Sequence, residues 1–174
     1  MPFPPIAVVG RACLLPGAHS PEELWRMVRE GRDLIRPVPE GRWGLPRDEV
    51  VPGPGERDRA WTDRGGYVTG FEEVWDPTGF AVPASELEPL DPLFRWVLHT
   101  ARAALLDAGG QRDLERAGAI FGLLSFPSAG MARFAEGVWL GDRETRADPR
   151  ERFMSGLPAL LLKRALGLGG EAFT

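Results

Sequence analysis

The feature that most constrains the fold is the run from residue 117 to residue 124, which carries no charged side chain. A strand with one face in water alternates apolar and polar residues, and this run shows no such alternation. A strand without it is typical of a sheet that helices cover on both faces. The run therefore predicts a buried strand in a layered α/β fold.

Two more strands are expected near the ends of the sequence. Residues 6–10 are a β-branched, apolar run that ends at Gly10, which predicts another buried strand. Residues 172–174 predict the opening of a further strand, which we expect to be cut short at Thr174. A strand ending there should leave apolar surface uncovered.

Helices are predicted between these strands by their end signals. A helix should begin after Ser20, with Pro21 in its first turn and Glu23 completing a capping box, and should end at Gly31. Another should run from Asp91 to Gly109. Its expected apolar stripe is Leu93, Trp96, Val97, Ala101, Ala104, Leu105 and Ala108. Further helices are predicted over residues 129–140 and 157–166, and residues 143–151 form a charged surface segment.

Residues 33–83 are rich in proline and glycine and show no regular period, which would suit a disordered linker. Aromatic residues spread through the segment favour a loop that is held on a core instead. These aromatic residues are Trp43, Trp61, Tyr67, Phe71, Trp75 and Phe80.

Composition indicates one soluble domain spanning residues 1–174, with 43% hydrophobic and 26% charged residues. A net charge of -4 argues against nucleic acid or an anionic membrane as a partner. The single cysteine allows no internal disulfide, and neither a signal peptide nor a membrane span is evident. We therefore expect a cytoplasmic protein.

Few residues suit catalysis or metal binding. The sequence lacks a phosphate-binding loop, a nucleophile elbow and the histidine or cysteine pairs of a metal site. No cation is evidently placed to stabilise a thiolate at Cys13, so we expect an inert, buried cysteine. His19, His99, Asp76 and Asp91 are interpreted as structural or solvated groups. The residues by themselves do not name an activity.

Ordered motifs nevertheless resemble one family, the β-ketoacyl synthases. The opening from Ile6 to Trp25, with Ala12-Cys13-Leu14-Leu15-Pro16-Gly17-Ala18 and Ser20-Pro21-Glu22, is similar to the opening of modular ketosynthase domains. The later matches are Gly31-Arg32-Asp33, Val38-Pro39-Glu40-Gly41-Arg42-Trp43, Arg64-Gly65-Gly66-Tyr67, Leu90-Asp91-Pro92, Ala104-Leu105-Leu106-Asp107-Ala108-Gly109, the spaced Gly118, Gly122 and Ser125, and Leu166-Gly167-Leu168-Gly169-Gly170.

Two departures bear on the subgroup. The family often has phenylalanine at the position of Leu15, and glutamines in place of Leu93-Phe94-Arg95-Trp96. With residues 125–128, these departures look closer to the ketosynthases of polyunsaturated fatty acid synthases or related iterative multienzymes. The resemblance as a whole is to the ketosynthase domains of modular or iterative type I polyketide synthases or of polyunsaturated fatty acid synthases.

The resemblance implies a thiolase-like fold, of which this chain would be the N-terminal half, and a homodimer in the complete domain. It implies decarboxylative Claisen condensation of acyl and malonyl thioesters, with the substrates carried on the phosphopantetheine of an acyl carrier protein and no cofactor bound directly. The family's nucleophilic cysteine would fall just beyond Thr174, and both of its histidines later still. Cys13 matches the family's early structural cysteine, so no catalytic residue is assigned here. Met154 and Leu157 are expected to approach the acyl pocket.

Three functions therefore stand as alternatives. The chain is expected to be a fragment of an active condensing enzyme. A non-catalytic remnant or interaction module derived from a ketosynthase is the second alternative, since the chain holds no catalytic residue of the family. A standalone hydrolase or lyase ranks well below both.

Overall fold

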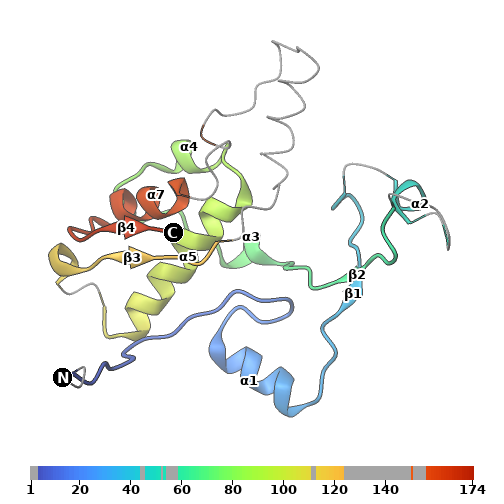
Figure 1. The fold of residues 1–174 in the computed structure, drawn as a ribbon, viewed down its shortest axis with the longest axis horizontal. Helices are drawn as coiled ribbons and strands as arrows, with labels where there is room; N and C mark the ends of the chain where they lie inside the picture. The colour runs from blue at the N-terminus through green and yellow to red at the C-terminus, as the bar shows by residue number, and fades with distance from the viewer. Residues whose placement is uncertain are drawn as a thin grey trace, which may run out of the picture. The chain divides into compact units, whose positions relative to one another are not determined.

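The computed structural model describes residues 4–43, 46–51, 53, 59–110, 113–123, 150 and 156–174 (Figure 1). The chain divides into two compact units. We call Met1–Ala12 with Trp75–Thr174 the sheet unit, and Cys13–Val74 the loop unit. Each is described by itself.

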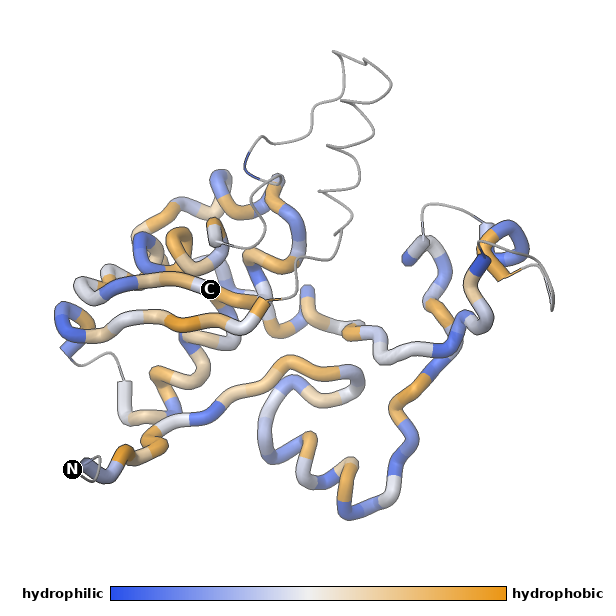
Figure 2. The backbone as a smooth tube through the Cα atoms, in the orientation of Figure 1, coloured by the Kyte–Doolittle hydropathy of each residue, from blue (hydrophilic) through white to orange (hydrophobic). Residues whose placement is uncertain are grey.

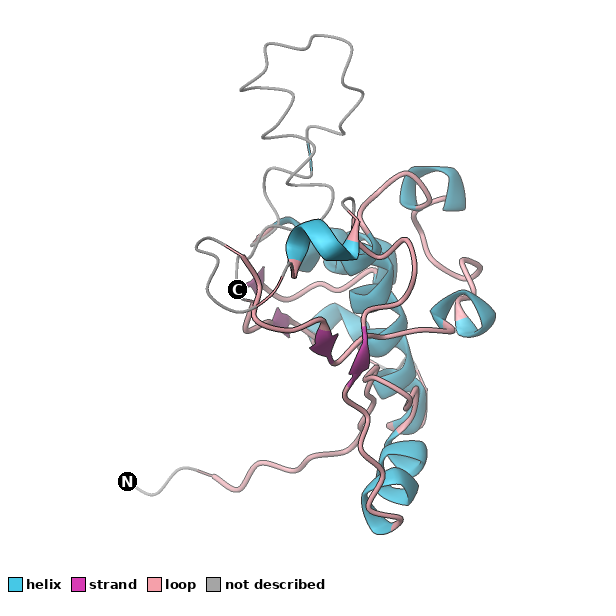
Figure 3. Ribbon diagram, turned by 90° about the vertical axis from the view of Figure 1, so that its right-hand side faces the viewer, coloured by secondary structure: helices cyan, strands magenta, loops and turns pink. Residues whose placement is uncertain are grey.

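The sheet unit places helices against a small parallel sheet. Its elements are α4 (Ala84–Leu87), α5 (Pro92–Asp107), the 3-10 helix η1 (Leu114–Arg116), β3 (Ala119–Ile120), α7 (Leu157–Leu166) and β4 (Ala172–Phe173). Strands β3 and β4 run parallel, with Ala119 opposite Ala172 and Ile120 opposite Phe173. Parallel neighbours need a crossover connection, and α7 lies between the two strands in sequence. The sheet unit thus has the expected α/β order, and its helices and short strands are distinguished in Figure 3.

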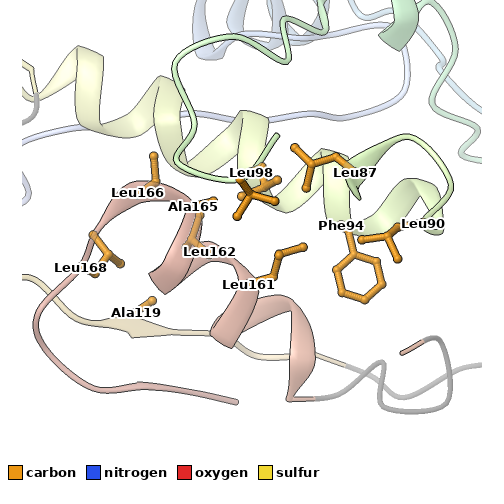
Figure 4. Close-up of a cluster of buried hydrophobic side chains, with 11 residues drawn as sticks. Leu87, Leu90, Phe94, Leu98, Ala119, Leu161, Leu162, Ala165, Leu166 and Leu168 are labelled. Carbon is orange, nitrogen blue, oxygen red and sulfur yellow. The ribbon is translucent and has the colours of Figure 1, made fainter. Parts of the chain in front are cut away.

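The core of the sheet unit lies where α5 meets α7 above the sheet. Figure 4 shows side chains of α4 and α5 facing those of α7, with Ala119 of β3 beneath them. Phe94 and Leu98 of α5 are 1% exposed, and Ala159 of α7 is 0% exposed. Figure 2 shows the predominantly hydrophobic colouring of α7 and of the strands beside it. Burial of these aliphatic and aromatic side chains supplies the main driving force for folding of this unit.

Both ends of α5 follow the predicted signals. At its start, Asp91 Oδ1 accepts a 3.0 Å hydrogen bond from the backbone N–H of Leu93, and Pro92 occupies the first turn. At its end, Gly109 has a φ of 94°, a conformation that favours glycine. The sequence therefore fixes the length of the longest described helix.

The loop unit contains short elements joined by turns. They are α1 (Pro21–Arg29), β1 (Arg36–Pro37), α2 (Arg47–Val50), β2 (Arg64–Gly65) and α3 (Phe71–Val74). Strands β1 and β2 pair antiparallel. The Ser20 cap of α1 is confirmed, because its hydroxyl accepts from the N–H of Glu23 at 3.2 Å. The Glu23 carboxylate accepts from the N–H of His19, not of Ser20, so the expected capping box is shifted by one residue.

The buried strand expected over residues 6–10 is wrong. These residues form no strand, and Ile6, Val8 and Val9 are 92%, 83% and 72% exposed. A β-branched run favours extended backbone, but a strand also needs a hydrogen-bonded neighbour. In the structure β3 pairs with β4 and no described strand pairs with residues 6–10.

The expectation of a strand covered on both faces is confirmed on one face only. Ala119 is 8% exposed and faces the helices, whereas Ile120 is 75% exposed on the opposite face of the sheet. The side chains of successive residues in a strand point to opposite faces of the sheet. No described element packs over the side chain of Ile120. The strand itself also spans less of the run than expected, Ala119–Ile120.

Other expectations have mixed outcomes. On α5 the most buried side chains are Phe94 and Leu98, which the predicted stripe omitted, while Val97, Ala101 and Leu105 of the stripe are partly buried and pack against the core cluster. Among the aromatic residues of the segment 33–83, Phe71 is buried, but Trp61 is 98% exposed and is not held on a core. The helix expected over 129–140 lies outside the described residues, as does most of the charged segment 143–151.

Candidate functional site

The sequence singled out Met154 and Leu157, and the structure places Leu157 at the first position of α7. Its side chain is half-buried and packs against the core cluster of the sheet unit. Pro158 follows it in the first turn, where a missing N–H is tolerated, and fixes the start of the helix. Met154 lies outside the described residues.

An apolar groove of about 350 Å3 lies on another side of the same core. It is bounded by residues 9–10, residues 117–121, and side chains of α5 and α7. Its lining holds no titratable side chain, so it can receive an apolar group but can supply neither a general acid nor a nucleophile.

Small residues open this groove. Gly10 lies so close to the backbone of Ala104 and to Ala108 that a side chain at residue 10 would clash with them. The N–H of the next residue, Arg11, donates a 2.7 Å hydrogen bond to Asp107 Oδ2, which fastens this segment to the end of α5. The groove was not predicted from the sequence, although alanines spaced three and four apart on α5 signal a close approach to that helix.

Cys13 is half-buried in the loop unit, just before the turn in which Leu15 and Ala18 exchange backbone hydrogen bonds. Burial raises the pKa of its thiol, and the nearby carboxylates of Glu22 and Glu23 raise it further. A nucleophilic cysteine needs the opposite, a lowered pKa. The environment therefore agrees with the expectation of an unreactive thiol.

The histidines occupy separate places in the fold. His19 Nε2 lies 2.9 Å from the carbonyl oxygen of Thr69, which links two loops of the loop unit. His99 lies on α5, and its side chain is half-buried rather than fully exposed to solvent. Within the described part of the chain, no group of three or more histidine, cysteine, aspartate or glutamate residues could hold a metal ion. In the same residues, no helix combines the length and the apolar character that crossing a bilayer demands.

Comparison with known proteins identifies the family. The family model described as "Beta-ketoacyl synthase, N-terminal domain" matches residues 4–170. The chain belongs to this family. Its ketosynthases are transferases of polyketide and fatty acid synthases, and the family match agrees with the ordered motifs from Ile6 to Gly170.

Two mycobacterial synthases are among the relatives that the chain matches. The mycocerosic acid synthase-like polyketide synthase of Mycolicibacterium smegmatis is 31% identical over 138 residues, which are 79% of this chain and 6% of that protein. The mycoketide-CoA synthase of Mycobacterium tuberculosis is 38% identical over 107 residues, 60% of this chain and 2% of that protein. The chain therefore spans a small fraction of the length of the relatives that it matches.

A solved ketosynthase structure shows the same fold. The "PfaC Keto synthase-Chain length factor" superposes with a TM-score of 0.84 and 26% identity, over 95% of this chain and 20% of that chain. The thiolase-like fold expected from the sequence is thereby confirmed.

Proposed function

We propose that this chain supplies the N-terminal scaffold of a β-ketoacyl-acyl carrier protein synthase. In this proposal the domain catalyses decarboxylative Claisen condensation of acyl and malonyl thioesters in polyketide or fatty acid biosynthesis. The observation that carries it is the match of one family model to residues 4–170, together with the ketosynthase fold.

The chemistry requires a nucleophile that the 174 residues do not offer. Condensation needs a thiolate that takes up the acyl group and donors that stabilise the thioester oxyanion. Cys13 is the chain's one thiol, and its raised pKa opposes thiolate formation. We infer that the nucleophilic cysteine and both histidines of the active domain lie outside residues 1–174, so that the chain by itself does not condense thioesters.

The chain's own contribution is structural and lies in the sheet unit. The packing of α7 on α5 fixes Leu157 at the start of α7, and we propose that Leu157, together with Met154, lines the acyl pocket. The substrates would arrive on the phosphopantetheine of an acyl carrier protein, the complete domain would act as a homodimer, and the protein would work in the cytoplasm. Membership of the family supports each of these points.

A chimera tests the proposal. Residues 4–170 would replace the matching segment in the ketosynthase domain of the mycocerosic acid synthase-like polyketide synthase. We expect the chimera to load an acyl group, detected by intact mass, and to release CO2 from a malonyl thioester. A second chimera carrying the matching segment of the mycoketide-CoA synthase controls for the junctions. Loading without condensation, while the control chimera condenses, would contradict the proposal.

The alternative is a non-catalytic remnant or interaction module, which the environment of Cys13 favours for the isolated chain. A purified chain that is monodisperse and melts cooperatively would support this alternative, whereas aggregation of the chain would contradict it. Thioester turnover that disappears in Cys13→Ala would overturn both functions as stated here.

A further inference from the structure

We propose that one face of helix α1 is a contact surface on which α1 of a second copy of this chain packs in the antiparallel direction. Trp25 and Val28 of this face are each 62% exposed. Glu22 and Arg29 are exposed beside them. We call these four residues the outer face of α1. The proposal concerns association of the chain and does not rest on the condensing activity.

Both ends of α1 are fixed by hydrogen bonds. At its start, the side chain of Ser20 caps the helix. At its end, the N–H of Gly31 donates to the carbonyl oxygen of Val28 at 3.1 Å. The N–H of Arg32 donates to the carbonyl oxygen of Met27 at 3.0 Å. Gly31 has a φ of 62°, and these bonds together form a Schellman motif. The outer face therefore stands on a regular helix with defined ends.

The outer face forms one stripe along α1. Its members are spaced three or four residues apart, the spacing of neighbours on a helix surface. Because an α-helix turns about 100° per residue, all four lie within about a third of its circumference. Leu24 and Met27, which are half-buried, lie on the opposite side. The stripe is thus presented to solvent as one surface.

Trp25 gives the outer face an apolar centre. Single exposed apolar residues are normal on protein surfaces. Here Val28 adjoins Trp25 on the helix, so the two form one patch. Tryptophan and arginine are enriched among the residues that dominate binding energy at protein interfaces. This composition favours a protein as the occupant, because a packed partner would remove both apolar side chains from water.

The charges of the outer face are ordered along the helix. Glu22 lies in the first turn of α1 and Arg29 in the last. Neither side chain forms a hydrogen bond or an ion pair with another described residue. Glu23, the other carboxylate of the first turn, instead accepts a hydrogen bond from the N–H of His19. Glu22 and Arg29 are therefore both available to a partner.

A second copy of α1 supplies the complement of this pattern by symmetry. When two copies pack antiparallel about a twofold axis beside Trp25, the first turn of each lies against the last turn of the other. Glu22 of each copy then meets Arg29 of the other, and the two indoles meet at the axis. A parallel arrangement would set each charge against its own kind, and like charges repel. An unrelated protein would need the same apolar centre and the same order of charges.

The test is sedimentation equilibrium of the complete 174-residue chain. Because one helical face is a small interface, we expect a reversible monomer–dimer equilibrium with a dissociation constant between about 10 μM and about 1 mM. Trp25→Ala should weaken dimerisation at least about tenfold, since the indole is lost from both copies. Trp61→Ala, which removes a 98% exposed indole of the same loop unit, is the matched control and should leave dimerisation unchanged.

Exchanged charges test the antiparallel order. Glu22→Arg and Arg29→Glu each set like charges against one another in the dimer, and each alone should weaken dimerisation about five- to tenfold. In an equimolar mixture, a dimer with one copy of each variant has opposite charges at both contacts. The mixture should therefore associate more strongly than either variant alone. Arg36→Glu changes an exposed arginine of β1 outside the outer face and should have no effect.

Circular dichroism of each variant checks that it folds like the unaltered chain. A chain that remains monomeric up to about 1 mM would overturn the proposal. A mixture that associates no more than its components, or equal effects of Trp25→Ala and Trp61→Ala, would also overturn it, because the copies would then meet through another surface or in another direction. The readout is association alone, so its failure is distinguishable from failure of the proposed condensing function.

Discussion

The guanidinium of Arg102 lies over the ring of Phe80, 4.4 Å from the ring centre. The same group donates to two backbone carbonyl oxygens, Thr78 O at 2.6 Å and Asp76 O at 2.7 Å. Phe80 in turn stacks on Trp75, with 5.8 Å between ring centres. One side chain of α5 therefore holds the loop that precedes α4.

Replacing Arg102 with alanine should lower the free energy of unfolding. The change removes two charge-assisted hydrogen bonds and a cation–π contact at a side chain that is 15% exposed. We expect a loss of about 2–3 kcal/mol in urea unfolding. Arg102→Lys should recover part of it, because a lysine keeps the charge but not the planar fork. Arg116→Ala, at an exposed arginine of η1, is the control; equal losses for the two alanine variants would refute the anchoring role.

The aromatic residues Phe94 and Trp61 should respond oppositely to truncation. Phe94 is 1% exposed at the α5–α7 contact, and Trp61 is 98% exposed. Phe94→Ala should cost about 3–5 kcal/mol of unfolding free energy, because it leaves a cavity in the core. Trp61→Ala should change it by less than about 0.5 kcal/mol. Thermal or urea unfolding measures both, and comparable losses would contradict the assigned core.

The thiol of Cys13 should be slow to alkylate. Because its pKa is raised by burial, and next by Glu22 and Glu23, the folded chain holds less thiolate than the unfolded chain at the same pH. The stabilisation from burying the neutral thiol is fully present below the pKa of the unfolded chain. It is lost as the pH rises through the higher pKa of the folded chain.

The measurement is the rate of reaction with iodoacetamide between about pH 7 and about pH 10, in buffer and in urea. The folded chain should react more slowly and show the higher apparent pKa. Glu22→Gln should move that pKa downward, by less than unfolding does, since burial is the larger cause. Faster reaction in buffer than in urea would show an activated cysteine instead.

Leu157 should influence the choice of acyl chain in the active chimera. If it lines the acyl pocket, Leu157→Phe shortens the pocket and lowers kcat/KM for the longer of two acyl thioesters about tenfold relative to the shorter. Leu160→Phe alters a leucine of the same helix that is 54% exposed and should leave the ratio unchanged. Competition between the two thioesters, followed by product mass, gives the ratio. An unchanged ratio in Leu157→Phe would remove this residue from the pocket.

Local signals predicted helix ends well because the groups involved are neighbours in sequence. Ser20 and Asp91 cap α1 and α5, since each side chain needs only the N–H groups of the first turn. Predictions of burial were less successful. The pattern of α5 does not show that α7 packs beside Phe94 and Leu98, because the direction of approach depends on residues more than fifty positions away.

For the candidate site, too, local sequence signals were predictive, whereas features that depend on distant contacts were not. The ordered motifs predicted the family and the ketosynthase fold, and a chemical argument from Cys13 predicted an inert thiol. The groove at Gly10 was not predicted, because it is formed by segments that only the folded chain brings together.

The sequence by itself determined the family, the capped starts of α1 and α5, the α/β order of the sheet unit, and the absence of a second thiol. The tertiary structure alone decided that residues 6–9 remain exposed, that the side chain of Ile120 is uncovered, and that Arg102 holds a loop rather than facing solvent. The physical reason is the range of the forces involved. Caps and turns depend on a few adjacent residues, whereas burial depends on which distant surfaces meet.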